Sequence, residues 1–147
     1  MYYNICAPSI AMRKVVFSLA LFCWGWRDLG VLMAGELVYI EKNEDLAGCV
    51  ELAAGVPSVA LDMEADSFHH YFHKVCLLQM SVNNHHFVID PLARIDLSPL
   101  FDVLRPRCIV LHGGDYDLRM LYRGYAFVPE RIFDTMTAAR LLGHGQI

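Results

Sequence analysis

The sequence lacks a basic excess, paired cysteines and a long apolar run, and each absence excludes a class of protein. Twelve lysines and arginines against sixteen aspartates and glutamates leave a formal net charge of −4, which argues against a protein that holds nucleic acid mainly through a basic surface. The five cysteines are scattered and form no Cys-x-x-Cys pair, so neither a disulfide framework nor a zinc knuckle is expected. This cysteine pattern favours a reduced, cytoplasmic protein.

The longest apolar stretch, residues 15–26, is about a dozen residues long, whereas an unaided membrane span needs about 20. Arg13 and Lys14 precede it, which is the outline of a signal peptide. We favour another explanation, in which Met33 is the natural start and the residues before it are an upstream extension. Residues 1–36 are therefore expected to be an N-terminal extension, either non-native or weakly signal-like, and no stable membrane association is expected.

The remaining sequence is typical of one folded domain, because 56% of the 147 residues are hydrophobic. Apolar segments bounded by turn residues predict strands over residues 37–40, 58–64, 75–82, 86–90 and 108–112. Helices are predicted at 43–54 with Asn43 as N-cap, from Asp96 or Ser98 to before Pro106, at 115–123, and at 135–142 with Asp134 as cap. Three antiparallel strands, then a parallel strand with crossover helices, indicate an α/β mixed sheet.

Asp62 and Glu64 lie one residue apart at the end of the predicted strand 58–64. Residues i and i+2 of a strand point to the same face, so the two carboxylates project side by side. Carboxylates this close repel each other, and a shared proton or a divalent cation such as Mg²⁺ or Mn²⁺ relieves the repulsion. For an isolated Asp-x-Glu, a solvated acidic turn is the commoner explanation.

Five segments extend the pattern in a fixed order: residues 61–64 (LDME), 75–79 (VCLLQ), 90–92 (DPL), 111–121 (LHGGDYDLRML) and 133–143 (FDTMTAARLLG). Together they closely resemble the ribonuclease D family of 3′-to-5′ exonucleases, within the DEDD superfamily. The resemblance covers residues 37–147 and implies a ribonuclease H-like fold. It also implies hydrolysis of phosphodiester bonds from the 3′ end of RNA, with precursor tRNAs or single-stranded DNA as further candidate substrates.

The resemblance assigns the metal ligands to Asp62, Glu64 and Asp117. It implies that Asp62 bridges two Mg²⁺ or Mn²⁺ ions, that Glu64 holds the ion that activates water, and that Asp117 holds the other. Asp115 is the rival to Asp117, but residues i and i+2 of a helix face different ways, so only one can approach Asp62. The resemblance favours Asp117.

The family's third motif, Tyr-x-x-x-Asp or His-x-x-x-Asp, follows the segment 135–142 and is not found there before residue 147. The one spacing match, His86 to Asp90, lies on a predicted strand and is interpreted as chance. The exonuclease domain, 37–147, is therefore expected to be truncated before the third motif. The alternative function is a catalytically inactive domain that binds nucleic acid.

Other candidates have more ordinary explanations. A zinc site at His69, His70 and His73 with Asp66 is less expected than a polar loop. A tight turn is favoured over a phosphate cradle at Gly113 and Gly114. Asp134 is expected to be a helix cap rather than a ligand. Three aromatic side chains could stack on a terminal base or fill core space: Phe68, Tyr71 and Tyr116.

Overall fold

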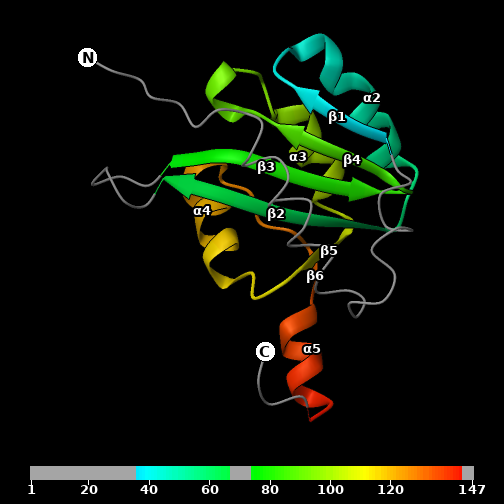
Figure 1. Cartoon of the computed structure of the whole chain (residues 1–147), viewed down its shortest axis with the longest axis vertical. Coiled ribbons are helices and arrows are strands. Elements are labelled where there is room, and N and C mark those ends of the chain that lie inside the picture. The colour runs from blue at the N-terminus through cyan, green and yellow to red at the C-terminus, as the bar shows by residue number, and fades with distance from the viewer. Residues whose placement is uncertain (1–35, 67–73, 144–147) are drawn as a thin grey trace. The chain divides into compact units, whose positions relative to one another are not determined.

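The structure is a computed structural model that describes residues 36–66 and 74–143 (Figure 1). The chain divides into two units, residues 1–34 and 35–147, and the described residues all belong to the second. The predictions for the N-terminal extension, for the three histidines and for Phe68 and Tyr71 lie outside the described residues. The predicted domain boundary therefore stays a prediction.

Six strands form one mixed sheet in the order β1-β4-β3-β2-β5-β6. They are β1 (Glu36–Ile40), β2 (Ser58–Asp66), β3 (Lys74–Val82), β4 (His85–Ile89), β5 (Cys108–Leu111) and β6 (Arg131–Asp134). The β2–β3 and β3–β4 pairs are antiparallel, whereas β1–β4, β2–β5 and β5–β6 are parallel. The predicted order of three antiparallel strands followed by a parallel strand is therefore confirmed.

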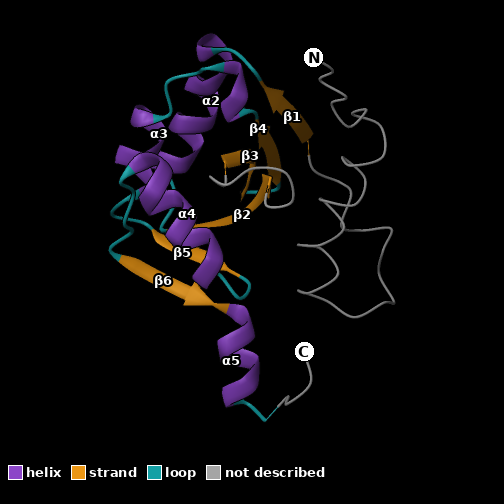
Figure 2. Cartoon of the chain, turned by 90° about the vertical axis from the view of Figure 1, so that its left-hand side faces the viewer, coloured by secondary structure: helices purple, strands orange, loops and turns teal. Residues whose placement is uncertain are grey.

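Three helices cover one side of this sheet: α2 (Asn43–Ala54), α3 (Ser98–Leu104) and α4 (Asp115–Tyr125) (Figure 2). A short 3₁₀ turn, η1 (Pro91–Ala93), follows β4, and α5 (Thr135–Leu141) follows β6 directly. The hydrophobic core consists of side chains from both the helices and the sheet. Its buried apolar side chains include Leu46, Cys49, Ala53, Val59, Leu61, Met63, Leu78, Met80, Leu100, Leu104, Ile109, Leu111, Met120 and Leu121.

Strand β2 owes its two different faces to the period of two in its sequence. Val59, Leu61 and Met63 are buried in the core, while the alternate residue Asp62 is half-buried and Glu64 is exposed. The carboxylates therefore lie on the face of β2 opposite to that of its core residues, with apolar side chains behind them. This is the arrangement that the sequence pattern predicts.

The β3–β4 hairpin is also confirmed. Asn83 and Asn84 both adopt the left-handed conformation, with φ of 46° and 64°. Two successive positive φ values are typical of the type I′ turn, whose twist suits a two-residue hairpin. Asparagine tolerates this conformation better than other residues with a side chain.

The predicted N-cap of α2 is wrong. Lys42 occupies the N-cap position and Asn43 is the first helical residue. The Asn43 side-chain oxygen instead accepts the backbone N–H of Asp96 at 2.8 Å, so it connects α2 to the loop before α3. The Asp96 side chain in turn accepts the N–H of Ser98 at 3.0 Å. The Asn43 side chain therefore forms a tertiary hydrogen bond instead of capping the start of α2.

Among residues 36–66 and 74–143, no helix has both the length and the apolar character that a membrane crossing requires.

Candidate active site

The predicted carboxylates come from two elements that finish or begin at the same edge of the sheet. Asp62 and Glu64 lie in the second half of β2, and Asp117 lies in the first turn of α4. Helix α4 begins just after β5, which pairs with β2 in parallel. The carboxyl ends of parallel strands meet at one edge of a sheet, where sites of α/β proteins commonly form.

The electrostatics indicate that the three carboxylates lie close enough for their charges to interact. The pKa of Asp117 is raised to about 6, first by burial and then by the negative charges of Asp62, Glu64 and Asp134. Burial also raises the pKa of Asp62, against the opposing effects of the Met63 backbone N–H and the charge of His112. The structure therefore brings together all three residues that the sequence singled out.

Glu64 is the most accessible member of this group. Its side chain as a whole is exposed, yet partial burial of the carboxyl group raises its pKa, and the charge of Asp62 raises it further. Because water screens a group at the surface, both effects are smaller here than in a buried site.

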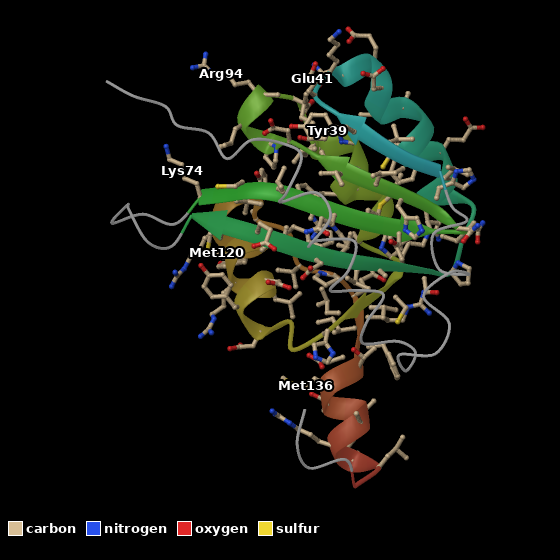
Figure 3. The ribbon with its side chains drawn as sticks, viewed as in Figure 1. Tyr39, Glu41, Lys74, Arg94, Met120 and Met136 are labelled. Carbon is tan, nitrogen blue, oxygen red and sulfur yellow. The ribbon has the colours of Figure 1, made fainter. Side chains whose placement is uncertain are left out.

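The described residues supply no ammonium or guanidinium ion pair to this cluster. Within the described part of the chain, none of the three carboxylates forms an ion pair with a lysine or arginine, and the ion pair found there joins Arg119 to Asp115. Lys74 begins β3, where β2 finishes, but its side chain points away from the sheet (Figure 3). Protons or a bound cation would relieve the repulsion among these carboxylates.

The donor set fits hard divalent cations, since carboxylate oxygens are the ligands that Mg²⁺ and Mn²⁺ prefer. In the described residues, however, no three His, Cys, Asp or Glu side chains are already arranged to hold one metal ion. The residue types at the site nevertheless suit a divalent metal. Their assignment as ligands stays a prediction.

Asp115 is not part of the cluster. Its carboxylate is exposed and accepts a 2.6 Å hydrogen bond from Arg119, one turn later on α4. Asp117, two residues further on, is half-buried, and the charges of Asp62 and Glu64 raise its pKa. The helical geometry that allows only one of the two aspartates to approach Asp62 therefore favours Asp117.

Asp134 caps α5, as predicted, and has a second role that the sequence did not indicate. Its Oδ1 accepts the N–H of Thr137 at 3.0 Å and that of Gly113 at 3.2 Å, and its Oδ2 accepts the N–H of Gly114 at 2.9 Å. These bonds join the start of α5 to the turn that leads into α4. Asp134 therefore helps to place Asp117.

The Gly113–Gly114 turn is tight rather than open to a phosphate. Gly113 adopts a φ of +64°, and a Cβ on Gly114 would lie 2.6 Å from Cδ1 of the buried Leu111. The backbone N–H groups of both glycines already donate to Asp134. They are therefore not available to cradle an anion in this conformation, in agreement with the tight turn predicted from the sequence.

A second network, which sequence reasoning missed, orients His112 beside the cluster. Thr135 Oγ1 donates its single hydrogen to the carbonyl oxygen of Leu111 at 3.0 Å. It must therefore accept from His112 Nδ1, 2.9 Å away, which assigns a proton to that nitrogen. The register that pairs Leu111 with Asp134 sets this contact, so only the β5–β6 pairing could have revealed it.

The remaining candidates have separate positions. His86 Nδ1 lies 2.8 Å from Ser81 Oγ, whereas Asp90 accepts the Tyr39 hydroxyl at 2.9 Å and the Leu92 N–H at 2.8 Å. Their shared spacing is therefore chance, as expected. Tyr116 is 39% exposed, so it does not fill the core, and its stacking on a base stays a prediction.

The raised pKa of Asp117 predicts how stability depends on pH. In metal-free buffer, Asp117→Asn is expected to stabilise the fold at pH 7 and to have little effect at pH 3. The pKa of Asp117 is about 6 in the folded protein and has an ordinary value of 3.8. As the pH rises between these two values, the wild type therefore becomes less stable relative to Asp117→Asn. Urea unfolding with a chelator measures this change. An equal effect of Asp117→Asn at both pH values would contradict the prediction. Asp115→Asn, at an exposed position of the same helix, is the control.

Comparison with known proteins identifies the family. Residues 37–147 match the model of the 3′-5′ exonuclease family. Ribonuclease D of Nitrobacter hamburgensis is 32% identical over 109 residues, which cover 72% of this chain and 28% of that protein. Escherichia coli RNase D, described as an exoribonuclease involved in structured RNA processing, aligns with a TM-score of 0.62 and 30% identity over 67% of this chain and 27% of that one.

The catalytic core of RRP6 from Trypanosoma brucei aligns with a TM-score of 0.68 and 28% identity, over 76% of this chain and 32% of that one. These structural matches confirm the predicted α/β, ribonuclease H-like mixed sheet. The chain spans less than a third of the length of the Nitrobacter and Escherichia proteins. The chain belongs to the 3′-5′ exonuclease family and carries part of a ribonuclease D-like exonuclease domain of the DEDD type.

Proposed function

We propose that the protein is a 3′-to-5′ exoribonuclease that uses two Mg²⁺ or Mn²⁺ ions. The observation that carries the proposal is the convergence of Asp62, Glu64 and Asp117 at one edge of the sheet, where burial and the charge of Asp62 raise the pKa values of both Glu64 and Asp117. Such a site gains most from divalent cations, which convert an anionic cluster that repels phosphate into one that attracts it.

The three carboxylates would hold the ions. When bound, a pair of such ions activates the attacking water and stabilises the leaving 3′ oxygen of a phosphodiester. His112, whose charge acts on Asp62, would help to keep that carboxylate ionised. Asp134 would act indirectly, because its bonds to the Gly113–Gly114 turn place the first turn of α4.

RNA is the proposed substrate class, with precursor tRNAs and single-stranded DNA as narrower candidates. Support comes from the ribonuclease D relatives, one of which is described as acting in structured RNA processing. The net charge of −4 adds a consequence, because RNA binding would depend on the metal rather than on a basic surface. A cytoplasmic location remains part of the proposal, and scattered cysteines support it.

The second candidate is a catalytically inactive domain that binds nucleic acid. It is favoured by one observation, namely that no three metal-binding side chains of the described residues are already arranged around a common point. An inactive domain would retain RNA binding that neither Mg²⁺ nor Mn²⁺ changes. The two candidates therefore differ in their response to a chelator.

Incubation of the protein with a 3′-labelled single-stranded RNA tests the proposal. We expect release of labelled mononucleotides in Mg²⁺ or Mn²⁺ and none in EDTA, because the carboxylates alone cannot activate water. A 5′-labelled RNA should shorten progressively under the same conditions, which distinguishes exonuclease from endonuclease activity. Failure to release mononucleotides in either metal would overturn the proposal, and metal-independent RNA binding would then favour the inactive domain.

A further inference from the structure

Gln79, in the middle of β3, is a buried polar residue without a full set of partners. Its side chain is only 3% exposed, and it is the one polar or charged residue in the buried core of the described ranges. Its amide Nε2 has no hydrogen-bond partner. A buried donor without an acceptor destabilises a fold, because it has lost its bonds to water and gained none in return.

The register of the sheet places this donor beside the candidate active site. Gln79 lies directly opposite Asp62 in the antiparallel β2–β3 pair, away from the irregularity between Glu64 and Ala65. Directly opposed residues of such a pair point to the same face, with Cβ atoms about 4.5–5.5 Å apart. A glutamine amide can span that separation.

The other nearest side chains of Gln79 on strands β3 and β4 are uncharged. Val88, opposite it on β4, is apolar, and so is Leu77, two residues away on β3. Ser81, on the other side, is a neutral hydroxyl that pairs with His86 at 2.8 Å. Asp62, directly opposite, offers Gln79 Nε2 the stronger acceptor, because its carboxylate is charged.

The unpaired amide of Gln79 and the carboxylate of Asp62 therefore lie on the same face of the β2–β3 pair. The carboxylates of the described residues are not grouped to hold a metal ion, and Asp62 accepts the backbone N–H of Met63. Carboxylates that ligate metals are commonly oriented by hydrogen bonds from a surrounding layer of residues. A rotation of Asp62 toward bound cations would give the amide of Gln79 an acceptor.

We propose that Gln79 is a positioning residue for Asp62, whose carboxylate accepts a hydrogen bond from Gln79 Nε2 when divalent cations occupy the site. This inference rests on the proposed function, since it requires Asp62 to be a metal ligand. Gln79 itself neither ligates the ions nor contacts the reacting phosphate. Its contribution is to hold one ligand in the orientation that binding requires.

Gln79→Met tests the inference, because methionine keeps the length of the side chain and removes the donor. Without metal, the variant should be as stable as the wild type or more stable, since a buried unpaired donor is gone. Its Mn²⁺ affinity, measured by calorimetry on the full chain, should fall by about 10-fold to 100-fold. Leu78→Met, on the opposite face of β3, is the matched control and should bind Mn²⁺ like the wild type.

The outcomes separate this inference from the proposed function. If the wild type does not bind Mn²⁺, the proposed function fails and the inference fails with it. If the wild type binds and Gln79→Met binds equally well, the inference alone is wrong. Loss of metal-free stability with unchanged affinity would likewise overturn it, because it would indicate a purely structural role.

An NMR measurement on the wild type does not depend on the folding of any variant. Addition of Mg²⁺ should move the side-chain amide protons of Gln79 downfield, as expected for a new hydrogen bond to a carboxylate. Those of Gln146, the other glutamine of the sequence, serve as an internal reference. Resonances of Gln79 that stay in place while the protein binds Mg²⁺ would refute the inference.

Discussion

Asp117→Asn is expected to reduce the rate of mononucleotide release by about 10²-fold to 10³-fold, the scale seen when one preorganised electrostatic group is removed from an active site. Asparagine has nearly the same shape but lacks the charge that holds a divalent cation. The loss should appear in kcat with saturating RNA. A 3′-labelled RNA and excess Mn²⁺ provide the measurement.

The loss of activity should not come from a loss of structure. The pKa of Asp117 is raised to about 6 by burial and by its acidic neighbours, so an uncharged side chain at this position relieves repulsion at neutral pH. The variant is therefore expected to be more stable than the wild type without metal. A protein that is more stable but far less active distinguishes a catalytic defect from a folding defect.

Asp115→Asn is the matched control, on the same helix and two residues earlier. Asp115 is exposed and pairs with Arg119 one turn further on, so its removal should change the rate less than about twofold, because exposed ion pairs contribute little. Equal losses in both variants would contradict the assignment of Asp117. Full activity in Asp117→Asn would exclude it as a metal ligand.

Much of the sheet could be predicted because its strands alternate between core and surface. Val59, Leu61 and Met63 repeat with a period of two that belongs to a strand with one buried face. Strand β6 was missed for the opposite reason. Its residues Arg131, Ile132 and Phe133 are exposed, and the strand joins the sheet through backbone pairing with β5. Such a strand leaves no hydrophobic pattern to detect.

In the candidate site, the acidic residues could be predicted from the sequence, whereas the contacts that support them could not. The resemblance to a known family selected Asp62, Glu64 and Asp117, because it rests on short segments that can be recognised in the sequence. The supporting contacts connect distant segments, as with Asp134 and Gly114, and Gln79 and Asp62. They depend on strand register and on burial, which local sequence does not encode. The same limitation explains the wrong N-cap, since the Asn43 bond to Asp96 joins two helices' starting regions.

Asp134→Ala is expected to lower the free energy of unfolding by about 2–3 kcal/mol, more than the loss of an ordinary helix cap, which costs about 1 kcal/mol. One carboxylate accepts three backbone N–H groups here, those of Thr137, Gly113 and Gly114. The substitution leaves these donors without their acceptor and frees the turn before α4. Activity should fall as well, because Asp117 lies in the first turn of that helix.

The pH dependence provides a second test of Asp134. Burial raises its pKa, but the backbone N–H groups of Thr137, Gly114, Gly113 and Met136 together lower it below the ordinary 3.8. The charged carboxylate therefore stabilises the fold above that value, and the contribution is lost as the pH falls through the lowered native pKa. The stability difference between wild type and Asp134→Ala should shrink accordingly in acid.

Asp96→Ala is the matched control for this variant, since Asp96 also precedes a helix but accepts a single backbone N–H, that of Ser98. Urea unfolding of both variants beside the wild type measures the difference, and Asp134→Ala should be clearly the less stable. Because one bond is lost in Asp96→Ala and three in Asp134→Ala, equal destabilisation would mean that the bonds to Gly113 and Gly114 contribute nothing. The turn would then be set by its glycines alone, and Asp134 would be only the cap of α5.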